Sequence, residues 1–394
     1  MTRVLFLTTL LCAALVAGCG VKKDPNPGPK VTPPPGLKPV RTVAPAEGEL
    51  NLVAPPGYAD VGGFTDGTGC AVKVTTAASS DDVVRLLGTG RYDGGLGTGD
   101  ATVRLVTAGD IAPINTALVA GYADVYGGLK QRSFNSVGGQ MFALPVGRAT
   151  NVLVWARDQV PGTLNGLAAV LDPAQVASYG GQVTVPDDPD HIAEAALWEQ
   201  TQRPDLKITD PYELDHRQFA AVIDVLRHQK PYVQGYWSAA DEAVKAFDSD
   251  EAIVGLVSQE AARAIEADAK PGEPFGEALP KEGAVGISPA WMVAAKPAHP
   301  GCMYRWLTHV LDPQVQARVA PAVHIAPSNR RACDVLGQAG DAAFCDAYHA
   351  GDDGYWSKVL FRTTPARDCG DARGRVCVDW DGWRRAWRSL TASA

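Results

Sequence analysis

The chain has 394 residues, of which 46% are hydrophobic and 20% are charged. This balance is typical of globular proteins and excludes a wholly disordered or fibrous chain, and the length suits two or three compact units. The formal net charge is −8, from 36 basic and 44 acidic side chains. Such acidity argues against a nucleic-acid partner, because duplex binders need a basic face to neutralise phosphates.

The N-terminus has the features of a bacterial lipoprotein signal. Arg3 supplies a positive charge, residues 4–16 form an apolar run too short to span a bilayer, and small residues precede Cys19. We expect residues 1–18 to be removed and Cys19 to be acylated on its thiol and its amine. This would anchor the protein in the lipid bilayer, on the outer face of the bacterial cell membrane. The alternative is an ordinary cleaved signal with an incidental cysteine.

A proline-rich segment follows the acylated cysteine. Eight of the 28 residues from 20 to 47 are proline, and no apolar periodicity is present. Proline fixes φ and favours extended, semi-rigid polyproline geometry. We interpret residues 19–47 as a lipidated cysteine and a tether, which leaves a body of about 345 residues, a length that suits two lobes.

The cysteines of the body indicate disulfides. Cys12 is lost with the signal, and six cysteines remain after Cys19. An even number in an oxidising compartment suggests pairing, for which six cysteines allow 15 connectivities. Proximity favours Cys333–Cys345 and Cys369–Cys377, which leaves Cys70–Cys302. The seven histidines have no i, i+4 pair, so neither a metal site nor a cofactor is expected.

The first part of the body alternates strands with helices. Strands are expected at 50–53 and 71–74, followed by a helix over 81–87 that Ser79 or Ser80 would cap. Residues 92–97 resemble a strand that enters a glycine-rich loop, and a helix should follow over 100–108. This alternation indicates an α/β body with a largely parallel sheet.

The same alternation continues toward the C-terminus. Strands are expected over 142–145, 151–155, 183–186, 252–257 and 285–293. Helices are expected over 191–201, 215–229, 258–269 and 302–311. Trp383 and Trp387 have i, i+4 spacing in the tail, which predicts a helix that docks one face on the body.

Motifs of common enzymes are missing. The sequence has no G-x-S-x-G, and Gly94 to Gly99 match neither a P-loop nor G-x-G-x-x-G. Asp187 and Asp188 could act as an acid–base pair, but adjacent acids at a strand end more often cap a helix. We therefore do not expect an enzyme; an extracytoplasmic enzyme that reuses this fold is a minor alternative.

Several short motifs, in one order, resemble the spermidine/putrescine-type substrate-binding proteins of ABC importers, nearest a YdcS-like branch. The resemblance covers about residues 49–390. The motifs are TGCAVKV at 68–74, YD at 92–93, GDA at 99–101, APINTAL at 112–118, IAEAAL at 192–197, DPY at 210–212, YW at 236–237, KEG at 281–283 and HPGCMY at 299–304.

The resemblance implies a two-lobed periplasmic-binding-protein fold of type II. Each lobe would be a mixed sheet flanked by helices, with the ligand held in a cleft at the hinge. Lobe 1 would comprise 48–147 plus 287–325, and lobe 2 would comprise 150–285 plus 327–390. The family function is to deliver a small polar solute, such as a polyamine, to an ABC permease in the membrane.

The positions that hold amines in the family are largely replaced here. The W-P-G-Y loop of the family is Pro55-Pro56-Gly57-Tyr58, so only Tyr58 remains, and the stretch from Gly57 to Gly69 is about ten residues short. The G-W-A-D loop of the family is Gly286-Ile287-Ser288-Pro289, and a family tryptophan aligns with Ser258. A Trp-Gly pair of the family is replaced here by Arg148-Ala149, and a tyrosine of the family is replaced by His191.

Residues carried over by position give the candidate ligand-binding set: Tyr58, Thr98, Asp100, Arg148, Asp187, His191, Ser258 and Ser288. Asp100 and Asp187 could instead cap the helices that they precede. Because aromatic faces and carboxylates are what stabilise a desolvated cation, we expect that the protein does not bind a linear polyamine in the usual way. It would take another small polar or anionic solute, or act as a surface interaction lipoprotein with a degenerate cleft.

Overall fold

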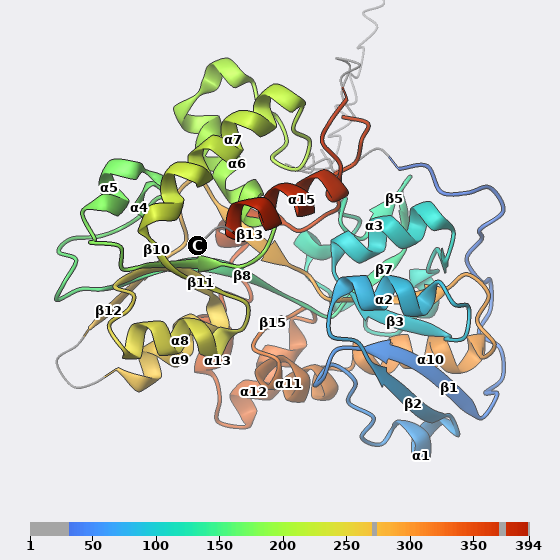
Figure 1. Ribbon diagram of the computed structural model, residues 1–394. Helices are drawn as coiled ribbons and strands as arrows, with labels where there is room; N and C mark the ends of the chain where they lie inside the picture. The colour runs from blue at the N-terminus through green and yellow to red at the C-terminus, as the bar shows by residue number, and fades with distance from the viewer. Residues whose placement is uncertain (1–30, 270–273, 370–375, 393–394) are drawn as a thin grey trace, which may run out of the picture.

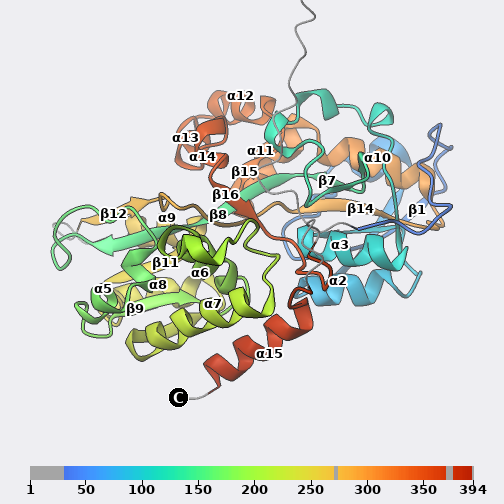
Figure 2. The same cartoon turned by 90° about the horizontal axis from the view of Figure 1, so that it is seen from above.

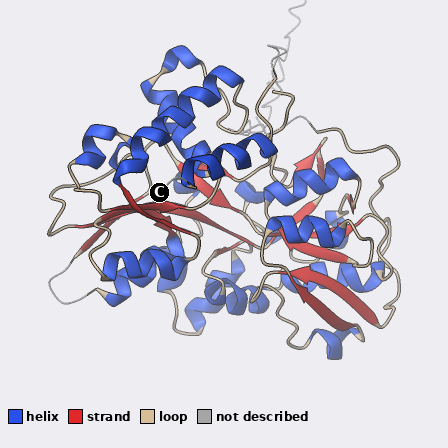
Figure 3. Cartoon of the chain, viewed as in Figure 1, coloured by secondary structure: helices blue, strands red, loops and turns tan. Residues whose placement is uncertain are grey.

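The computed structural model describes residues 31–269, 274–369 and 376–392, and these form a mixed α/β structure. Two large sheets lie side by side, each covered by helices (Figures 1 and 3). The α/β class expected from the sequence is confirmed. The expected signal peptide and Cys19 lie outside the described residues.

The first sheet has the strand order β2-β1-β3-β14-β4, and β7 also pairs with β14. Its parallel pairs are β1 with β2 and β1 with β3, whereas β14 runs antiparallel to its three neighbours. The strands are β1 (Glu49–Ala54), β2 (Ala71–Thr76), β3 (Gly94–Gly97), β4 (Ile111–Ala112), β7 (Ala143–Pro145) and β14 (Ala290–Ala294).

Alternation along β1 explains how the first sheet is covered. Leu50 and Leu52 pack into the same apolar cluster as Trp306 of α10 (Pro300–Val310). Val53 belongs instead to the cluster of α2 (Ser80–Leu87) and α3 (Gly99–Ala108). Successive side chains of a strand point to opposite faces, so β1 is apolar on both and helices cover both. The Ser79 hydroxyl accepts a hydrogen bond from Asp82 N and caps α2.

The second sheet has the order β10-β9-β11-β8-β13-β16, with β12 and β15 also paired to β8. Its parallel pairs are β9 with β10, β9 with β11 and β13 with β16, whereas β8 is antiparallel to its neighbours. Both large sheets are therefore mixed rather than largely parallel. The strands are β8 (Gly147–Ala156), β9 (Val183–Pro186), β10 (Val233–Trp237), β11 (Val254–Ser258), β12 (Phe275–Ala278), β13 (Ala284–Ile287), β15 (Ala326–Pro327) and β16 (Val359–Phe361).

Helices α6 and α7 lie on one face of the second sheet, and α8 and α9 lie on the other (Figure 1). The capping box of α7 explains its start, because Asp215 accepts from Gln218 N while the Gln218 side chain accepts from Asp215 N. The helices around this sheet are α4 (Ala168–Leu171), α5 (Pro173–Ala177), α6 (His191–Gln202), α7 (His216–Gln229), α8 (Ala240–Asp248) and α9 (Gln259–Asp268).

The single strand expected over 285–293 is wrong. The structure has two strands there, β13 in the second sheet and β14 in the first. Ser288 and Pro289 separate them, because proline cannot donate to a strand ladder. The chain therefore passes between the sheets at this point, as it also does between β7 and β8.

The segment after β15 lies beneath the junction of the sheets. It contains α12 (Arg331–Gln338), α13 (Ala343–Ala347) and α14 (Asp353–Trp356), and it follows α11 (Pro313–Ala322). Its Tyr348, Ala350 and Trp356 join the apolar cluster that also holds Trp291 and Trp306. Although these residues fall in the range expected for lobe 2, they contribute to the core of the first sheet.

Both ends of the described chain pack on the body. Within 31–47, the Glu47 carboxylate accepts hydrogen bonds from Gly301 N and Cys302 N at 2.8 Å each. Helix α15 (Trp380–Thr391) buries Trp383 and Trp387 in the core of the second sheet. Of the tether expected over 19–47, residues 19–30 lie outside the described residues, and residues 44–47 contact the body instead of standing free of it.

The remaining short elements are α1 (Phe64–Thr68) and a separate two-stranded antiparallel sheet of β5 (Ser136–Val137) and β6 (Gln140–Met141). In the stretch that the sequence marks as short, between Gly57 and Gly69, α1 with its five residues is the one helix of the structure. The six body cysteines form the expected pairs: Cys333–Cys345 and Cys369–Cys377, which proximity favours, and Cys70–Cys302, which remains.

Candidate functional site

A cavity of about 250 Å³ lies where strands of the second sheet end near the crossing to the first. Strands β8, β9, β10, β11 and β13, the start of α6, and Arg362 just after β16 supply its walls. The lining residues are Ala149, Thr150, Asn151, Pro186, Asp187, Asp188, Asp190, His191, Trp237, Ser238, Ser258, Val285, Gly286, Ile287 and Arg362. Polar groups that converge at strand ends are typical of ligand sites in α/β proteins.

Arg362 and two carboxylates form the charged centre of this cavity. The Nη2 of Arg362 lies 2.5 Å from Oδ2 of Asp188, and its Nε faces Oδ2 of Asp190. Burial by itself would lower the pKa of the Arg362 guanidinium, but these carboxylates, with a further contribution from Asp100, hold that pKa well above its usual value. Arg362 is therefore a permanent cation inside the cavity.

Asp187 and His191 line the cavity, but their polar atoms are engaged by neighbours. An Asp187 oxygen accepts a hydrogen bond from the Trp387 indole at 2.8 Å. The His191 ring is fully buried, and its Nδ1 lies 2.7 Å from the Glu194 carboxylate. Ser258 also lines the cavity while its hydroxyl caps α9 by accepting from Ala261 N. Of the eight predicted residues, these three are the ones that form the wall.

Thr98 and Asp100 lie beside the cavity, at the start of α3, which packs on the first sheet. The Asp100 carboxylate accepts hydrogen bonds from the hydroxyls of Ser80, at 3.0 Å, and of Thr98. Its carbonyl oxygen accepts from the Thr364 hydroxyl at 2.7 Å. The residues of this helix start therefore satisfy one another and contact the chain that follows Arg362.

Arg148, Ser288 and Tyr58 do not line the cavity. The guanidinium of Arg148 is buried 4.4 Å from the ring centre of Trp356 and donates to the Ala350 carbonyl at 2.8 Å. Burial lowers the pKa of this group, although an arginine remains charged in proteins. The Ser288 hydroxyl donates to Gly147 O at 2.9 Å and so joins the two crossing strands. Burial raises the pKa of the Tyr58 phenol, with a smaller contribution from Glu260.

Sequence reasoning missed Asp190, Trp237 and Arg362 as site residues, and it weighed Asp188 as an acid–base partner of Asp187 or a helix cap but not as a ligand-binding residue. Trp237 lies in the YW motif and ends β10, so the motif could have indicated a tryptophan at the end of a strand. Arg362 follows the apolar run Val359–Phe361, which could have indicated a buried strand that ends in a charge. Nothing in the sequence, however, indicates that these two segments meet.

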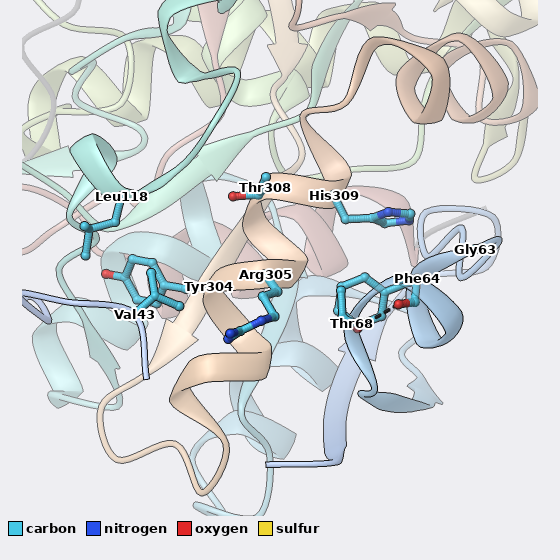
Figure 4. A pocket seen from close by; sticks show the side chains of 10 residues that line it. Val43, Gly63, Phe64, Thr68, Leu118, Tyr304, Arg305, Thr308 and His309 are labelled. Atoms are coloured by element: carbon cyan, nitrogen blue, oxygen red, sulfur yellow. Dashed lines mark hydrogen bonds between the residues drawn. The ribbon is translucent and has the colours of Figure 1, made fainter. Parts of the chain in front are cut away.

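A second cavity, of about 320 Å³, lies on the first-sheet side of the molecule. Tyr304, Arg305, Thr308 and His309 reach it from α10, and Phe64 and Thr68 reach it from α1 (Figure 4). The His309 ring nitrogen Nε2 lies 2.7 Å from the Asp60 carbonyl, and Arg305 donates to the Ala44 carbonyl. The polar side chains of this second cavity thus mostly hydrogen-bond to backbone carbonyls.

The chemistry of the strand-end cavity suits the binding of a solute. Within residues 31–269, 274–369 and 376–392, no group of three acidic, histidine or cysteine side chains could hold a metal ion. Across the same residues, no helix is both long and apolar enough to cross a membrane. What the cavity offers is a mixture of hydrogen-bonding groups, one tryptophan face and a charged centre.

Similar proteins have the same architecture. The family model of bacterial extracellular solute-binding proteins matches residues 62–337. Among solved structures, a candidate spermidine/putrescine ABC transporter protein from Listeria monocytogenes is similar with a TM-score of 0.68 at 13% identity, over 88% of this chain and 100% of that one. The spermidine/putrescine ABC transporter substrate-binding protein PotD from Streptococcus pneumoniae is similar with a TM-score of 0.65 at 14% identity, over 87% and 97%.

An ABC transporter substrate-binding protein from Bradyrhizobium japonicum gives a TM-score of 0.61 at 14% identity, over 88% of this chain and 100% of that one. At such identities these structures establish the fold, which is the two-lobed fold of type II periplasmic binding proteins. The family match covers most of the body and includes the strands that build the cavity. This chain therefore belongs to the bacterial extracellular solute-binding proteins.

Proposed function

We propose that this protein is the solute-binding component of an ABC importer, held at the outer face of the cell membrane by acylated Cys19. The observation that carries the proposal is the cavity of about 250 Å³ at the strand ends beside the crossing between the sheets. In this proposal the two lobes are built around the two sheets. They would close on a small polar solute by a hinge motion and dock on a membrane permease.

The solute is not a linear polyamine bound in the usual way. Among the described residues that line the cavity, Trp237 is the only tryptophan, tyrosine or phenylalanine, and Asp188 and Asp190 are already paired with Arg362. A desolvated ammonium costs several kcal/mol unless it is paired. The hydrogen-bonding groups of the wall instead favour a small polar solute.

Native mass spectrometry of the mature protein without its lipid tests solute binding directly. We expect a co-purified small molecule that is lost in Trp237→Ala, because this change removes one wall of the cavity. Trp380→Ala is the matched control, since Trp380 is partly buried but does not line the cavity. A bound molecule that survives Trp237→Ala and is lost in Trp380→Ala would place the site elsewhere.

Calorimetry with putrescine and spermidine tests the ligand class. We expect no binding of either at micromolar concentration, and micromolar affinity would refute this part of the proposal. The lipid anchor is tested separately, by detergent phase partitioning of whole-cell extracts. The wild type should enter the detergent phase and Cys19→Ala should stay in the aqueous phase; an aqueous wild type would contradict the anchor.

Arg362 favours a second candidate, a surface interaction lipoprotein whose cleft has lost its transport role. If the cleft no longer binds a transported solute, an arginine of the chain itself can remain paired with Asp188 and Asp190 inside it. Deleting the gene and screening for loss of solute uptake separates the two. An importer component predicts a specific uptake defect, whereas an interaction lipoprotein predicts none.

A further inference from the structure

The guanidinium of Arg362 lies against two carboxylates that line the cavity, those of Asp188 and Asp190. Asp188 and Asp190 lie in the turn between β9 and α6, and both direct a carboxylate oxygen at Arg362. Asp190 is almost fully buried, whereas 22% of the Arg362 side chain is exposed. Burial raises the pKa of the Asp190 carboxyl, and the adjacent Arg362 guanidinium opposes that rise. A buried carboxylate is stabilised by a paired cation, and here the chain itself provides one.

The backbone around Arg362 lies between the second sheet and the helix α3 that packs on the first sheet. Arg362 N donates to Gly286 O at 2.8 Å, which extends the pairing of β16 with β13. A Cβ placed on Gly99 would lie 2.2 Å from Arg362 O, so this contact with α3 requires glycine. The Thr364 hydroxyl then binds the Asp100 carbonyl. The position of Arg362 is thus fixed by contacts with β13 of the second sheet and with the start of α3, which packs on the first sheet.

Helix α15 extends the same connection across the outside of the junction. The Trp387 indole binds Asp187 on the second-sheet side. Arg384 reaches Asp81 of α2 at 2.9 Å on the first-sheet side. Figure 2 shows α15 beside α7, with one end near α2. The C-terminal segment therefore contacts both halves at the place where Arg362 enters the cavity.

We propose that Arg362 is the resident cation of this cavity: it fills the guanidinium or amine subsite formed by Asp188 and Asp190, and it excludes cationic solutes from that subsite. The proposal rests on the proposed function only in treating the cavity as the solute site. Removal of Arg362 would leave two carboxylates without their counter-ion, and a small guanidinium or amine would then bind in its place.

The test is chemical rescue of the full mature protein. Arg362→Ala is titrated with ethylguanidinium, which matches the missing head group, and thermal unfolding is followed. We expect a rise of the unfolding temperature with saturation, and an affinity at least about tenfold higher than that of the wild type, which keeps its own cation. Arg85→Ala, which breaks an exposed pair with Asp82, should respond as the wild type does.

A triple variant, Arg362→Met with Asp188→Asn and Asp190→Asn, removes the whole charged centre. It should fold and should show no saturable response to ethylguanidinium. Arg362→Gln provides a second single variant if Arg362→Ala does not fold, because it keeps a polar side chain in the cavity.

A folded Arg362→Ala or Arg362→Gln that shows no saturable rescue would overturn the proposal, as would equal rescue of the triple variant. Neither result depends on transport. Failure of the proposed importer function would appear as unchanged solute uptake after gene deletion, and the rescue would remain.

Discussion

The docking of α15 allows a quantitative test of how the C-terminal segment is held. The perturbation is Trp383→Ala. Trp383 is fully buried, its ring stacks on Tyr212 with centroids 5.7 Å apart, and it contacts Phe219 of α7 at 5.9 Å. The residue therefore anchors one face of α15 in the core of the second sheet.

The size of the effect follows from these contacts. Replacing a buried Trp by Ala typically costs about 3–5 kcal/mol, through lost burial and the cavity that remains. The stacked Tyr212 pair accounts for about 0.5–1.5 kcal/mol of interaction beyond area burial. We expect the global free energy of unfolding to fall by about 3 kcal/mol or more if α15 stays docked, because the core then retains the void. If α15 detaches, the loss is capped at its docking free energy.

Denaturant unfolding followed by circular dichroism measures the loss of global stability when α15 stays docked. Hydrogen exchange of residues 380–391 detects detachment of α15. Trp380→Ala is the control, because Trp380 is only partly buried at the first position of the same helix. Its cost should be clearly smaller. The reasoning is refuted if Trp383→Ala changes neither the unfolding midpoint nor the exchange protection of α15, or if Trp380→Ala costs more.

Two further predictions concern the disulfides and alkaline pH. The double variant Cys70→Ser, Cys302→Ser opens a loop with a sequence separation of 232, whereas Cys369→Ser, Cys377→Ser opens one of 8. The first should lose about 2–5 kcal/mol in denaturant unfolding and the second less; an equal or larger loss for the short loop would contradict the chain-entropy argument. Burial, with a smaller contribution from Asp187, raises the pKa of Tyr236 to about 12. Because this exceeds the usual value of about 10, the contribution of Tyr236 is fully present below pH ~10 and is lost as the pH rises toward about 12. Tyr236→Phe should reduce this alkaline loss of stability, and an unchanged slope of the unfolding midpoint against pH would speak against it.

Much of the local structure could be predicted from the sequence. The Ser79 cap with acids in the next turn marks the start of α2, and the alternation of Leu50, Leu52 and Val53 marks β1 as a strand buried on both faces. These signals act between residues that are close in the chain, so they need no tertiary context. The strand expected over 285–293 was wrong because its apolar character continues through the point where the chain changes sheets.

The candidate site was predicted only in part. Asp187, His191 and Ser258 line the cavity, because their strands and helices follow the family order. Arg148 was expected near the cleft, but the structure places its charge against Trp356 and the Ala350 carbonyl, outside the cavity lining. A position can be carried over from a family, whereas the direction of a long side chain depends on which neighbours bury it.

The sequence by itself determined the α/β class, the positions of most elements, the relationship to solute-binding proteins and the pairs of cysteines that proximity favours. These follow from periodicity, caps, motif order and spacing along the chain. Only the tertiary structure decided that Arg362 lies against Asp188 and Asp190 in the cavity. Arg362 lies 174 residues from Asp188, and their contact depends on the pairing of β16 with β13 and on the close approach at Gly99. No local pattern encodes a charge pair of such separation, because folding of both sheets is what brings its members together.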